Sequence, residues 1–293
     1  MSSFREMSSS RDKQRTIKKD VSISGTGLFT GTKVQMCFCP APENSGIVFK
    51  RIDLPGAPQC PALAENVIGT PRCTILGFEE CTVQCVEHVL AAISGYGIDN
   101  LLIELKGPEV PIGDGSAMPF VEMIEEAGVC HQNAKKVWHR LSAPIYWTQG
   151  DVHLVALPYD EFRISYTLNY PESKLLRSQF YTFVHDEERF KKDIAKCRTF
   201  SLYEEIVPLI EKSQIKGGSL ENALVIKDDA ILNPEGAYFP DEMARHKVLD
   251  LIGDLSLTGF RFYAHVIAVR SGHFSNTAFA KEITNHIHAE ASV

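Results

Sequence analysis

The sequence lacks the features that mark several large classes of protein. No apolar run approaches the roughly 18 residues that a membrane-spanning helix needs. Basic residues are not in excess, because 30 Lys and Arg stand against 37 Asp and Glu for a net charge of -7, which argues against a dedicated nucleic-acid-binding protein. Pro, Gly and Gln are not enriched, so a disordered chain is not expected. Residues 1–15 have no apolar core, and we expect no secretory signal there.

Cysteine is present in eight copies but without the spacing of a functional motif. No CxxC pair occurs, and no cysteine lies beyond Cys197. Disulfide frameworks belong to shorter, cysteine-dense secreted domains, so we expect free thiols in a reducing compartment. Cys81 and Cys85 are four residues apart and could ligate a soft metal. No second pair completes a zinc site, however, and buried unreactive thiols are the favoured interpretation.

The chain is long enough for a large core and carries a pattern that occurs twice. With 293 residues it can bury about three quarters of its unfolded surface. A helix predicted over 82–95 is followed by an apolar strand at 101–105, a loop and a helix capped by Ser116. A helix over 241–257, a strand at 265–269, a loop and a helix from about Asn276 repeat this order. We therefore predict an α+β fold of two similar domains, each a β-sheet packed against helices.

The expected domain boundaries follow from changes in composition. Residues 1–14 are predicted to be a disordered polar tail, 15–134 the first domain and 135–293 the second, joined at a polar stretch over 133–136. Alternating apolar residues predict strands between 16 and 51. In the second domain an insert at about 202–232 contains a short helix, which Pro208 is expected to bend or end, and small strands. Inserts of this kind often shape a binding site.

The helix predicted over 241–257 carries several residues suited to metal binding. His246 and Asp250 fall one turn apart on one stripe, with Asp254 and Lys247 beside them and aliphatic residues on the other side. Two ligands on one helix can bind one cation, and mixed nitrogen and oxygen donors suit zinc better than magnesium, with iron or cobalt as alternatives. Such a pair is also common as a solvated surface feature, so this segment alone leaves both interpretations open.

Two other histidines could complete a catalytic site. His88 projects opposite the aliphatic face of the helix over 82–95, beside Glu87. With His246 and Asp250 it would supply the three protein ligands of a catalytic zinc site, and Glu87 could take a proton from water. The local sequence slightly favours an exposed Glu87–His88 pair, because nothing in it shows that the two helices meet.

His273 follows a strand and is expected in a loop. Protonated, it could stabilise an oxyanion or protonate a leaving amine, held in the charged form by Asp254. A solvated loop histidine is the equally open alternative.

Taken together and in order, these residues resemble one enzyme family, the zinc-dependent UDP-3-O-acyl-N-acetylglucosamine deacetylases of lipid A biosynthesis. The sequence departs from the family at Phe29, where His is frequent. The matching stretches run through nearly the whole chain: Gln14–Ile17, Gly25–Gly31, Val86–Ala92, Gly97–Asn100, Pro111–Phe120, Arg198–Phe200, Gly217–Ser219, Arg245–Asp254 and Ser271–His273.

The resemblance implies a fold and a reaction. The fold is two similar α+β domains, each with a small insert, with the active site between them. The reaction is hydrolysis of the 2-N-acetyl group of UDP-3-O-(3-hydroxyacyl)-N-acetylglucosamine, which releases acetate in the committed step of lipid A biosynthesis. Zn2+ is the implied cofactor, with Fe2+ as the alternative. The implied setting is the cytoplasm of a Gram-negative-type bacterium. We expect a monomer with no nucleic-acid partner, no transmembrane segment and at most peripheral membrane contact.

The resemblance also implies roles for individual residues. The metal ligands fall on His88, His246 and Asp250. The general base falls on Glu87, and the second acid/base group on His273 with Asp254 behind it. Oxyanion stabilisation falls on Thr199, and Lys247 contacts substrate.

The remaining implied contacts concern the two ends of the substrate. Tyr170 and Arg270 fall where the family binds the nucleotide, as an aromatic surface for uracil and a cation near the diphosphate. The insert would form an apolar passage for the acyl chain, for which core packing is the alternative role of each residue. Candidate wall residues are Phe200, Leu202, Ile206, Ile215 and Ser219.

Two other functions remain open at this point. One is a zinc deacetylase that acts on a different N-acyl sugar, which the apolar insert disfavours. The other is a non-catalytic binding module stabilised by a metal. A structural zinc site is normally closed by four ligands, so three ligands with a Glu alongside favour catalysis.

Overall fold

The structure of the protein, a computed structural model, describes residues 12–291. Most of the polar tail expected over 1–14 therefore lies outside the described residues. The end of that segment is not a tail, because strand β1 (Lys13–Ile17) begins within it. β1 pairs antiparallel with β10 (Val129–Lys135). Most of the polar stretch expected as a domain junction thus belongs to a paired strand.

The first half of the chain forms a five-stranded sheet in the order β2-β3-β9-β4-β5. The β4–β9 pair is parallel, whereas β2–β3, β3–β9 and β4–β5 are antiparallel. The predicted alternation along β3 is confirmed, since Val34, Met36 and Phe38 are buried and the residues between them are more exposed. The strands are Val21–Thr26 (β2), Lys33–Pro40 (β3), Ile47–Arg51 (β4), Gln59–Pro61 (β5) and Leu101–Lys106 (β9).

The second half forms a sheet in the order β12-β13-β19-β14-β15, with the short β11 paired to β19. Its β14–β19 pair is parallel, and β12–β13, β13–β19 and β14–β15 are antiparallel. The two large sheets therefore share one strand order and one set of strand directions, which confirms the predicted repeat. The strands are Trp138–Arg140 (β11), Ile145–Gln149 (β12), Val152–Leu157 (β13), Phe162–Tyr170 (β14), Arg177–Val184 (β15) and Arg261–Val269 (β19).

Each half also contains a small three-stranded sheet. In the first half it consists of β6 (Val67–Gly69), β7 (Ile75–Phe78) and β8 (Cys81–Gln84). In the second it consists of β16 (Phe200–Leu202), β17 (Leu224–Lys227) and β18 (Ala230–Ile231), with helix α5 (Tyr203–Glu211) after β16. The short helix and small strands expected in this region are present, but α5 continues through Pro208. The carbonyl that Pro208 leaves unbonded belongs to Glu204, an exposed residue that water can reach.

The expected start of the first strong helix at residue 82 is wrong. Residues 81–84 are strand β8, and the helix, α2, spans Glu87–Gly95. Cys81 and Val83 are buried while Thr82 and Gln84 are half-buried, which is the period of two of a strand. The spacing of Val83 and the later apolar residues also fits a helical stripe, so periodicity alone could not separate the two.

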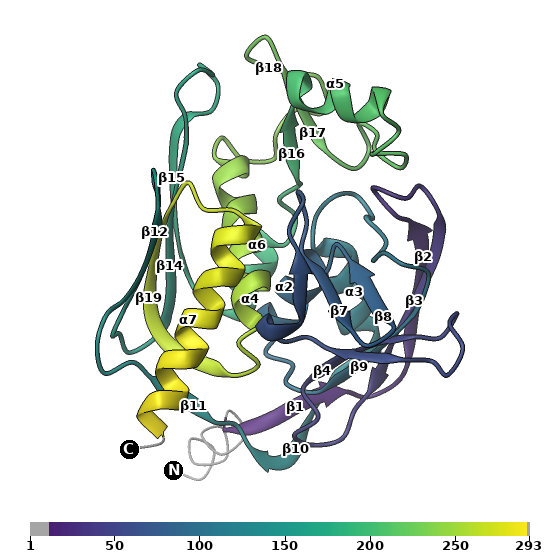
Figure 1. Cartoon of the computed structure of the whole chain (residues 1–293), viewed down its shortest axis with the longest axis vertical. Helices are drawn as coiled ribbons and strands as arrows, with labels where there is room; N and C mark the ends of the chain where they lie inside the picture. Colours follow the sequence, from purple (N-terminus) through teal and green to yellow (C-terminus); the bar gives the residue numbers. More distant parts are fainter. Residues whose placement is uncertain (1–11, 292–293) are drawn as a thin grey trace.

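The main helices lie between the two large sheets (Figure 1). Besides α2 they are α3 (Met118–Ala127), α6 (Glu242–Ser256) and α7 (His273–Ala291). α7 begins three residues before the predicted start, so His273 is its first residue rather than part of a loop. Short helical segments lie at Ala64–Asn66 (η1), Glu187–Arg189 (α4) and Phe190–Ile194 (η2). Among the described residues no helix is long and apolar enough to cross a membrane.

α2 from the first half packs directly against α6 from the second. Gly253 makes this approach close, because a Cβ on it would lie 2.1 Å from the carbonyl oxygen of Glu87. Buried aliphatic residues on both helices, such as Val89 and Leu249, join one core. Glu87 and the three predicted metal ligands lie on these same two helices, so the packing that buries the aliphatic faces also brings these polar residues together.

Candidate active site

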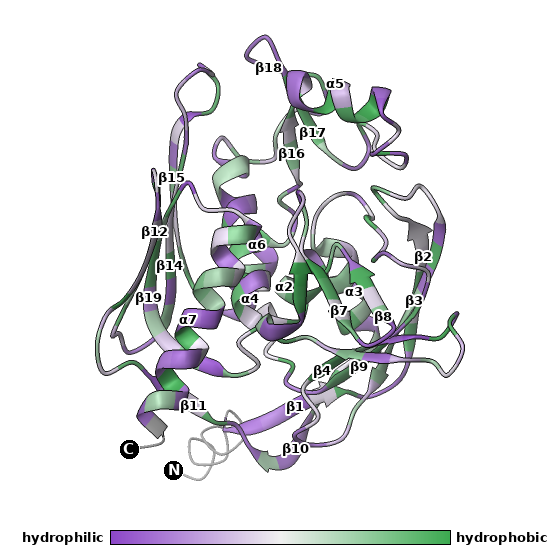
Figure 2. Ribbon diagram, viewed as in Figure 1, coloured by the Kyte–Doolittle hydropathy of each residue, from purple (hydrophilic) through white to green (hydrophobic). Residues whose placement is uncertain are grey.

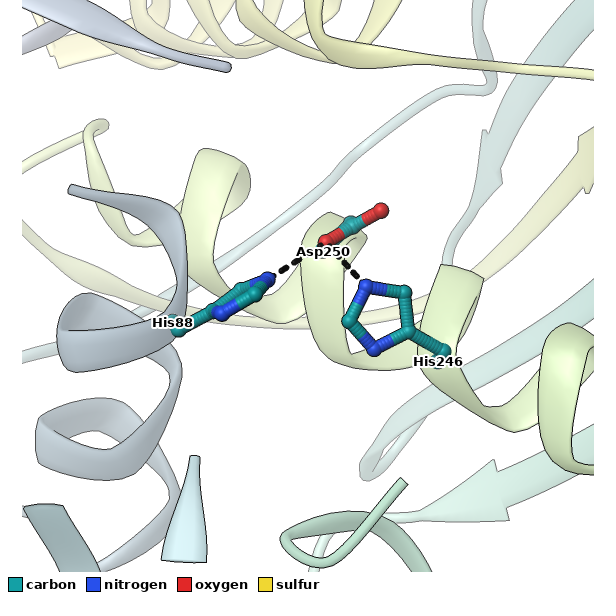
Figure 3. Close-up of side chains that lie close together, drawn as sticks. All are labelled: His88, His246 and Asp250. Carbon is teal, nitrogen blue, oxygen red and sulfur yellow. Dashed lines mark ion pairs between the residues drawn. The ribbon is translucent and has the colours of Figure 1, made fainter. Parts of the chain in front are cut away.

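Three side chains that can ligate a metal meet where α2 and α6 cross. His88 is on α2, whereas His246 and Asp250 are one turn apart on α6 (Figure 3). Oδ1 of Asp250 lies 3.5 Å from Nε2 of His88 and 3.3 Å from Nε2 of His246, and the donor atoms all lie within 4.8 Å of one another. Tetrahedral ligands at zinc-like bond lengths are separated by about 3.3–3.5 Å. The spacing therefore fits one shared cation.

The surroundings of these donors leave the inner atoms available to a cation. Nδ1 of His246 lies 2.9 Å from the carbonyl oxygen of Cys197 and donates its proton there, which leaves Nε2 free as a ligand. Burial lowers the pKa of His246 to about 3, so the ring is neutral. Lys247 donates to Oδ2 of Asp250 at 2.8 Å, while the buried Oδ1 has no hydrogen-bond partner among residues 12–291. A bound cation would satisfy this oxygen.

Burial decides between the interpretations that the sequence left open. The exposed fraction is 1% for His246, 2% for Asp250, 4% for Glu87 and 8% for His88. The interpretation of Glu87 and His88 as an exposed polar pair is therefore wrong, as is that of a solvated His246–Asp250 pair. Asp254 is wholly buried as well.

His273 lies close to Glu87 and is held by Asp254. Its Nδ1 is 2.9 Å from Oδ2 of Asp254, and its Nε2 is 3.7 Å from Oε1 of Glu87. The His273 side chain is only 11% exposed, so it is not a solvated loop residue. His273 and Glu87 thus come from two helices in different halves of the chain. Nε2 of His273 faces the carboxylate of Glu87.

The charge states of this pair are set by burial and by neighbouring charges. Burial by itself would lower the pKa of His273, but the carboxylates of Asp254, Glu87 and Asp250 outweigh it and raise the pKa to about 10. Burial raises the pKa of Glu87, an effect that the charges of His273 and His88 only partly offset. Burial would also raise the pKa of Asp250, but the charge of Lys247, with that of protonated His273, holds it well below its usual value. The site can therefore hold one protonated His beside ionisable carboxylates.

Three supporting residues were not found from the sequence. Thr74 and Asn276 donate hydrogen bonds to Asp254 at 2.6 and 2.9 Å, and Gly253 permits the close approach of α2. A glycine inside a strong helical pattern is a visible signal of close packing. Nothing in the local pattern around Thr74 or Asn276 indicates their role, because their partner lies on another element.

Thr199 is placed at the site by a glycine of the stretch Pro111–Phe120. Gly115 has a positive φ of 84°, and a Cβ on it would meet the carbonyl oxygen of Asn222 at 2.1 Å. Its own carbonyl accepts a hydrogen bond from the Thr199 N–H at 2.8 Å. Only glycine allows the loop to approach the insert this closely.

A cavity of about 150 Å³ opens at these groups. Four residues expected to bind or stabilise substrate, Tyr170, Thr199, Phe200 and Lys247, line it. Other lining residues that matter here are Leu28, Phe29, Cys73, Cys85, Glu87, His88, Asp250 and His273. Two candidate metal ligands, His88 and Asp250, and the candidate acid/base residues, Glu87 and His273, therefore line one cavity.

A larger cavity of about 890 Å³ shares Tyr170, Glu205 and Lys247 with the first, so the two are adjacent. Arg270 and Leu202 line this larger space. The structure thus places Tyr170 and Arg270, both expected to contact the nucleotide, at one cavity beside the candidate metal ligands.

Three of the five expected acyl-passage residues line neither of these two cavities. Ile206 is half-buried on α5, and Ser219 is exposed, with its N–H donating to Asn222. Ile215 is half-buried beside Lys216, whose N–H donates to the carbonyl of Phe29 at 3.2 Å. The insert therefore contacts the Leu28–Phe29 turn at the smaller cavity.

Comparison with known proteins identifies the family of the chain. The family described as UDP-3-O-acyl N-acetylglycosamine deacetylase matches residues 14–285. The UDP-3-O-acyl-N-acetylglucosamine deacetylase of Chlamydia pneumoniae is 48% identical over 271 residues, which cover 92% of this chain and 96% of the relative. The enzymes of the same name from Chlamydia caviae (47% over 270 residues; 92% and 96%) and Chlamydia trachomatis serovar L2 (44% over 277 residues; 94% and 96%) are similar. The resemblance read from the sequence is confirmed, and this chain belongs to the UDP-3-O-acyl N-acetylglycosamine deacetylase family.

Proposed function

We propose that this protein hydrolyses the 2-N-acetyl group of UDP-3-O-(3-hydroxyacyl)-N-acetylglucosamine and releases acetate, the committed step of lipid A biosynthesis. The observation that carries the proposal is one cavity lined by Glu87, His88, Asp250 and His273. Family membership supplies the substrate class. A metal-stabilised binding module would not need a buried acid/base pair beside its metal, and this argues against that alternative.

The metal that we propose is zinc, held by His88, His246 and Asp250. Two imidazole nitrogens and one carboxylate oxygen form the three-ligand set of a catalytic zinc site, which keeps one position open. Among the described residues no fourth His, Cys, Asp or Glu joins this cluster. A zinc ion there would polarise the amide carbonyl and make water more acidic. Iron(II) accepts similar donors and is the alternative that metal analysis distinguishes.

Glu87 and His273 would share the proton transfers. Glu87 is the base that accepts a proton from the attacking water. His273, whose Nδ1 bonds to Asp254, presents a protonated Nε2 to the cavity and can give its proton to the departing amine. The roles follow from the directions of the pKa shifts, because the pKa of His273 is raised to about 10 and the imidazolium persists at neutral pH.

Thr199 and Lys247 are proposed to act on the reacting group. The hydroxyl of Thr199 would donate to the oxyanion that develops on the amide carbonyl. Lys247 lies 2.8 Å from Oδ2 of Asp250 and lines both cavities, so its ammonium can contact substrate while it neutralises the ligand carboxylate. The Asp250 carboxylate raises the pKa of Lys247 above its usual value, against the effect of burial.

The two ends of the substrate would occupy different surfaces. We assign the larger cavity to the nucleotide, with the ring of Tyr170 against uracil and Arg270 near the diphosphate. The acyl chain would lie along the insert, whose helix α5 carries hydrophobic residues at the outer edge of the molecule (Figure 2). The proposed walls are Phe200, Leu202, Ile206, Ile215 and Ser219.

A single chain can supply the whole donor set, so we propose that the monomer is active. We also propose that residues 15–134 and 135–293 are two domains, because each half holds one of the two matching sheets. All eight cysteines are free, which supports a reducing, cytoplasmic location.

The test is acetate release by the purified protein from UDP-3-O-acyl-N-acetylglucosamine, with metal analysis of the same sample. We expect about one zinc per chain, turnover that a hydroxamate chelator inhibits, and little turnover of UDP-N-acetylglucosamine, which lacks the acyl chain. An Asp250→Ala variant is the matched inactive control. Equal turnover of both substrates would favour a deacetylase of simpler N-acyl sugars, and zinc-loaded protein without turnover would contradict the proposal.

A further inference from the structure

Thr74 is wholly buried and uses each of its polar atoms in the candidate site. Its backbone N–H donates to Oε2 of Glu87 at 2.9 Å, and its hydroxyl donates to Oδ1 of Asp254 at 2.6 Å. Its carbonyl accepts from the N–H of Val86 at 3.4 Å. Thr74, which directly precedes strand β7, thus holds carboxylates from two different helices.

The bond to Asp254 determines how that carboxylate meets His273. Oδ2 of Asp254 accepts from Nδ1 of His273 and from Nδ2 of Asn276, both at 2.9 Å. Oδ1 accepts from the Thr74 hydroxyl. A buried carboxylate oxygen that loses its donor is costly, so without the hydroxyl the group would turn to share the remaining donors. His273 would then turn with it, because Nδ1 follows its acceptor.

We propose that Thr74 is a positioning residue for the reaction, acting through Asp254 on His273 and through its backbone on Glu87. The inference rests on the proposed function, since it assigns a task to a residue that does not touch the reacting atoms. In this role Thr74 fixes the distance between the base, Glu87, and the acid, His273. Glu87 and His273 are 3.7 Å apart, and Thr74 is hydrogen-bonded to Glu87 and to the carboxylate that holds His273.

The experiment compares Thr74→Val with Thr74→Ser in the zinc-loaded enzyme. Valine has nearly the shape of threonine but no hydroxyl, whereas serine keeps the hydroxyl, and both keep the backbone N–H. We expect Thr74→Val to lower kcat by about 10–100-fold, as for other residues that orient active-site groups, with KM and zinc content close to those of the parent. Thr74→Ser should restore most of kcat. Equal kcat values in the parent and in Thr74→Val would overturn the inference.

A double-mutant cycle separates positioning from general structural support. In a His273→Gln background the further loss caused by Thr74→Val should fall to about twofold or less, because residues that act through one group are not additive. An undiminished loss in that background would overturn the inference. If Thr74→Val does not fold, Thr74→Cys, with its weaker S–H donor, carries the same cycle and should show an intermediate loss of kcat.

The same assays distinguish this inference from the proposed function. Zinc-loaded parent enzyme that releases no acetate would overturn the function and the inference with it. Active parent enzyme with fully active Thr74→Val would overturn the inference alone.

Discussion

Oε1 of Glu87 lies 3.7 Å from Nε2 of His273, although the two residues belong to opposite halves of the chain. Glu87 opens helix α2 and His273 opens helix α7. Both helices pack against α6, which carries two of the three candidate metal ligands. The pair is thus held by the helix that also carries His246 and Asp250, so Glu87, His273 and the candidate metal ligands are positioned by one packing arrangement.

Replacing Glu87 should separate metal binding from turnover. Glu87→Gln keeps the shape of the side chain and its bond to Thr74 but cannot accept the proton of water. We expect kcat to fall by about 10²–10⁴-fold, the usual range for a lost general base, with zinc content unchanged. Near-normal acetate release by Glu87→Gln would remove Glu87 as the base.

The alkaline limb of the pH profile should depend on His273. Its folded pKa is raised to about 10, so the proton is held at neutral pH and lost as pH rises through that value. A divalent cation on Asp250 will move this loss to lower pH, because it offsets a carboxylate charge. We expect kcat/KM to fall on the alkaline side in the parent and this limb to be absent in His273→Gln. Exposed His153 offers a control, since His153→Gln should keep the limb. A limb that survives in His273→Gln would assign it to another group.

We expect zinc and activity to be lost together when a candidate metal ligand is replaced. His88→Ala or Asp250→Ala should reduce zinc from about one per chain to near zero and almost abolish turnover, because the proposed site has only three protein ligands to hold the ion. Glu282→Ala, an exposed carboxylate on α7, should leave both unchanged. Chelation of the parent should stop turnover, and added zinc should restore it. Full zinc content in either ligand variant would contradict the assignment.

Gly253 should tolerate no side chain. A Cβ there would lie 2.1 Å from the carbonyl oxygen of Glu87, so Gly253→Ala must push α2 and α6 apart. Overpacking of this kind costs about 1–3 kcal/mol of the free energy of unfolding, and it displaces Glu87 as well. We expect a lower Tm and a reduced kcat. In the control Gly69→Ala the nearest atom to the new Cβ is 3.6 Å away, so its Tm should stay close to that of the parent. An unchanged Tm in Gly253→Ala would show that the helices can separate without cost.

The sequence was least informative where a stretch fits both the helical and the strand periodicity. It was also uninformative where the hydrogen-bond partners of a residue lie far away in the chain. Val83 and Val86 both fit a helical stripe. Val83, however, lies in β8, which pairs with β7 over 81–84, whereas Val86 directly precedes α2. Thr74 was missed because its hydrogen-bond partners, Glu87 and Asp254, lie on other elements. Ile206, Ile215 and Ser219 line neither cavity, and the sequence pattern of the insert does not reveal which neighbour each residue contacts.

The sequence by itself determined the repeated α+β order, the one-turn spacing of His246 and Asp250, and the family. Such features depend on neighbours within one element or on motifs in chain order. Only the tertiary structure decided that His88 joins that pair, that the cluster is buried, and that Glu87 faces His273. These contacts join elements far apart in the chain, and they exist because the aliphatic faces of α2 and α6 pack together with Gly253 at the closest point. Burial then sets the protonation of His246 and His273, which no local pattern encodes.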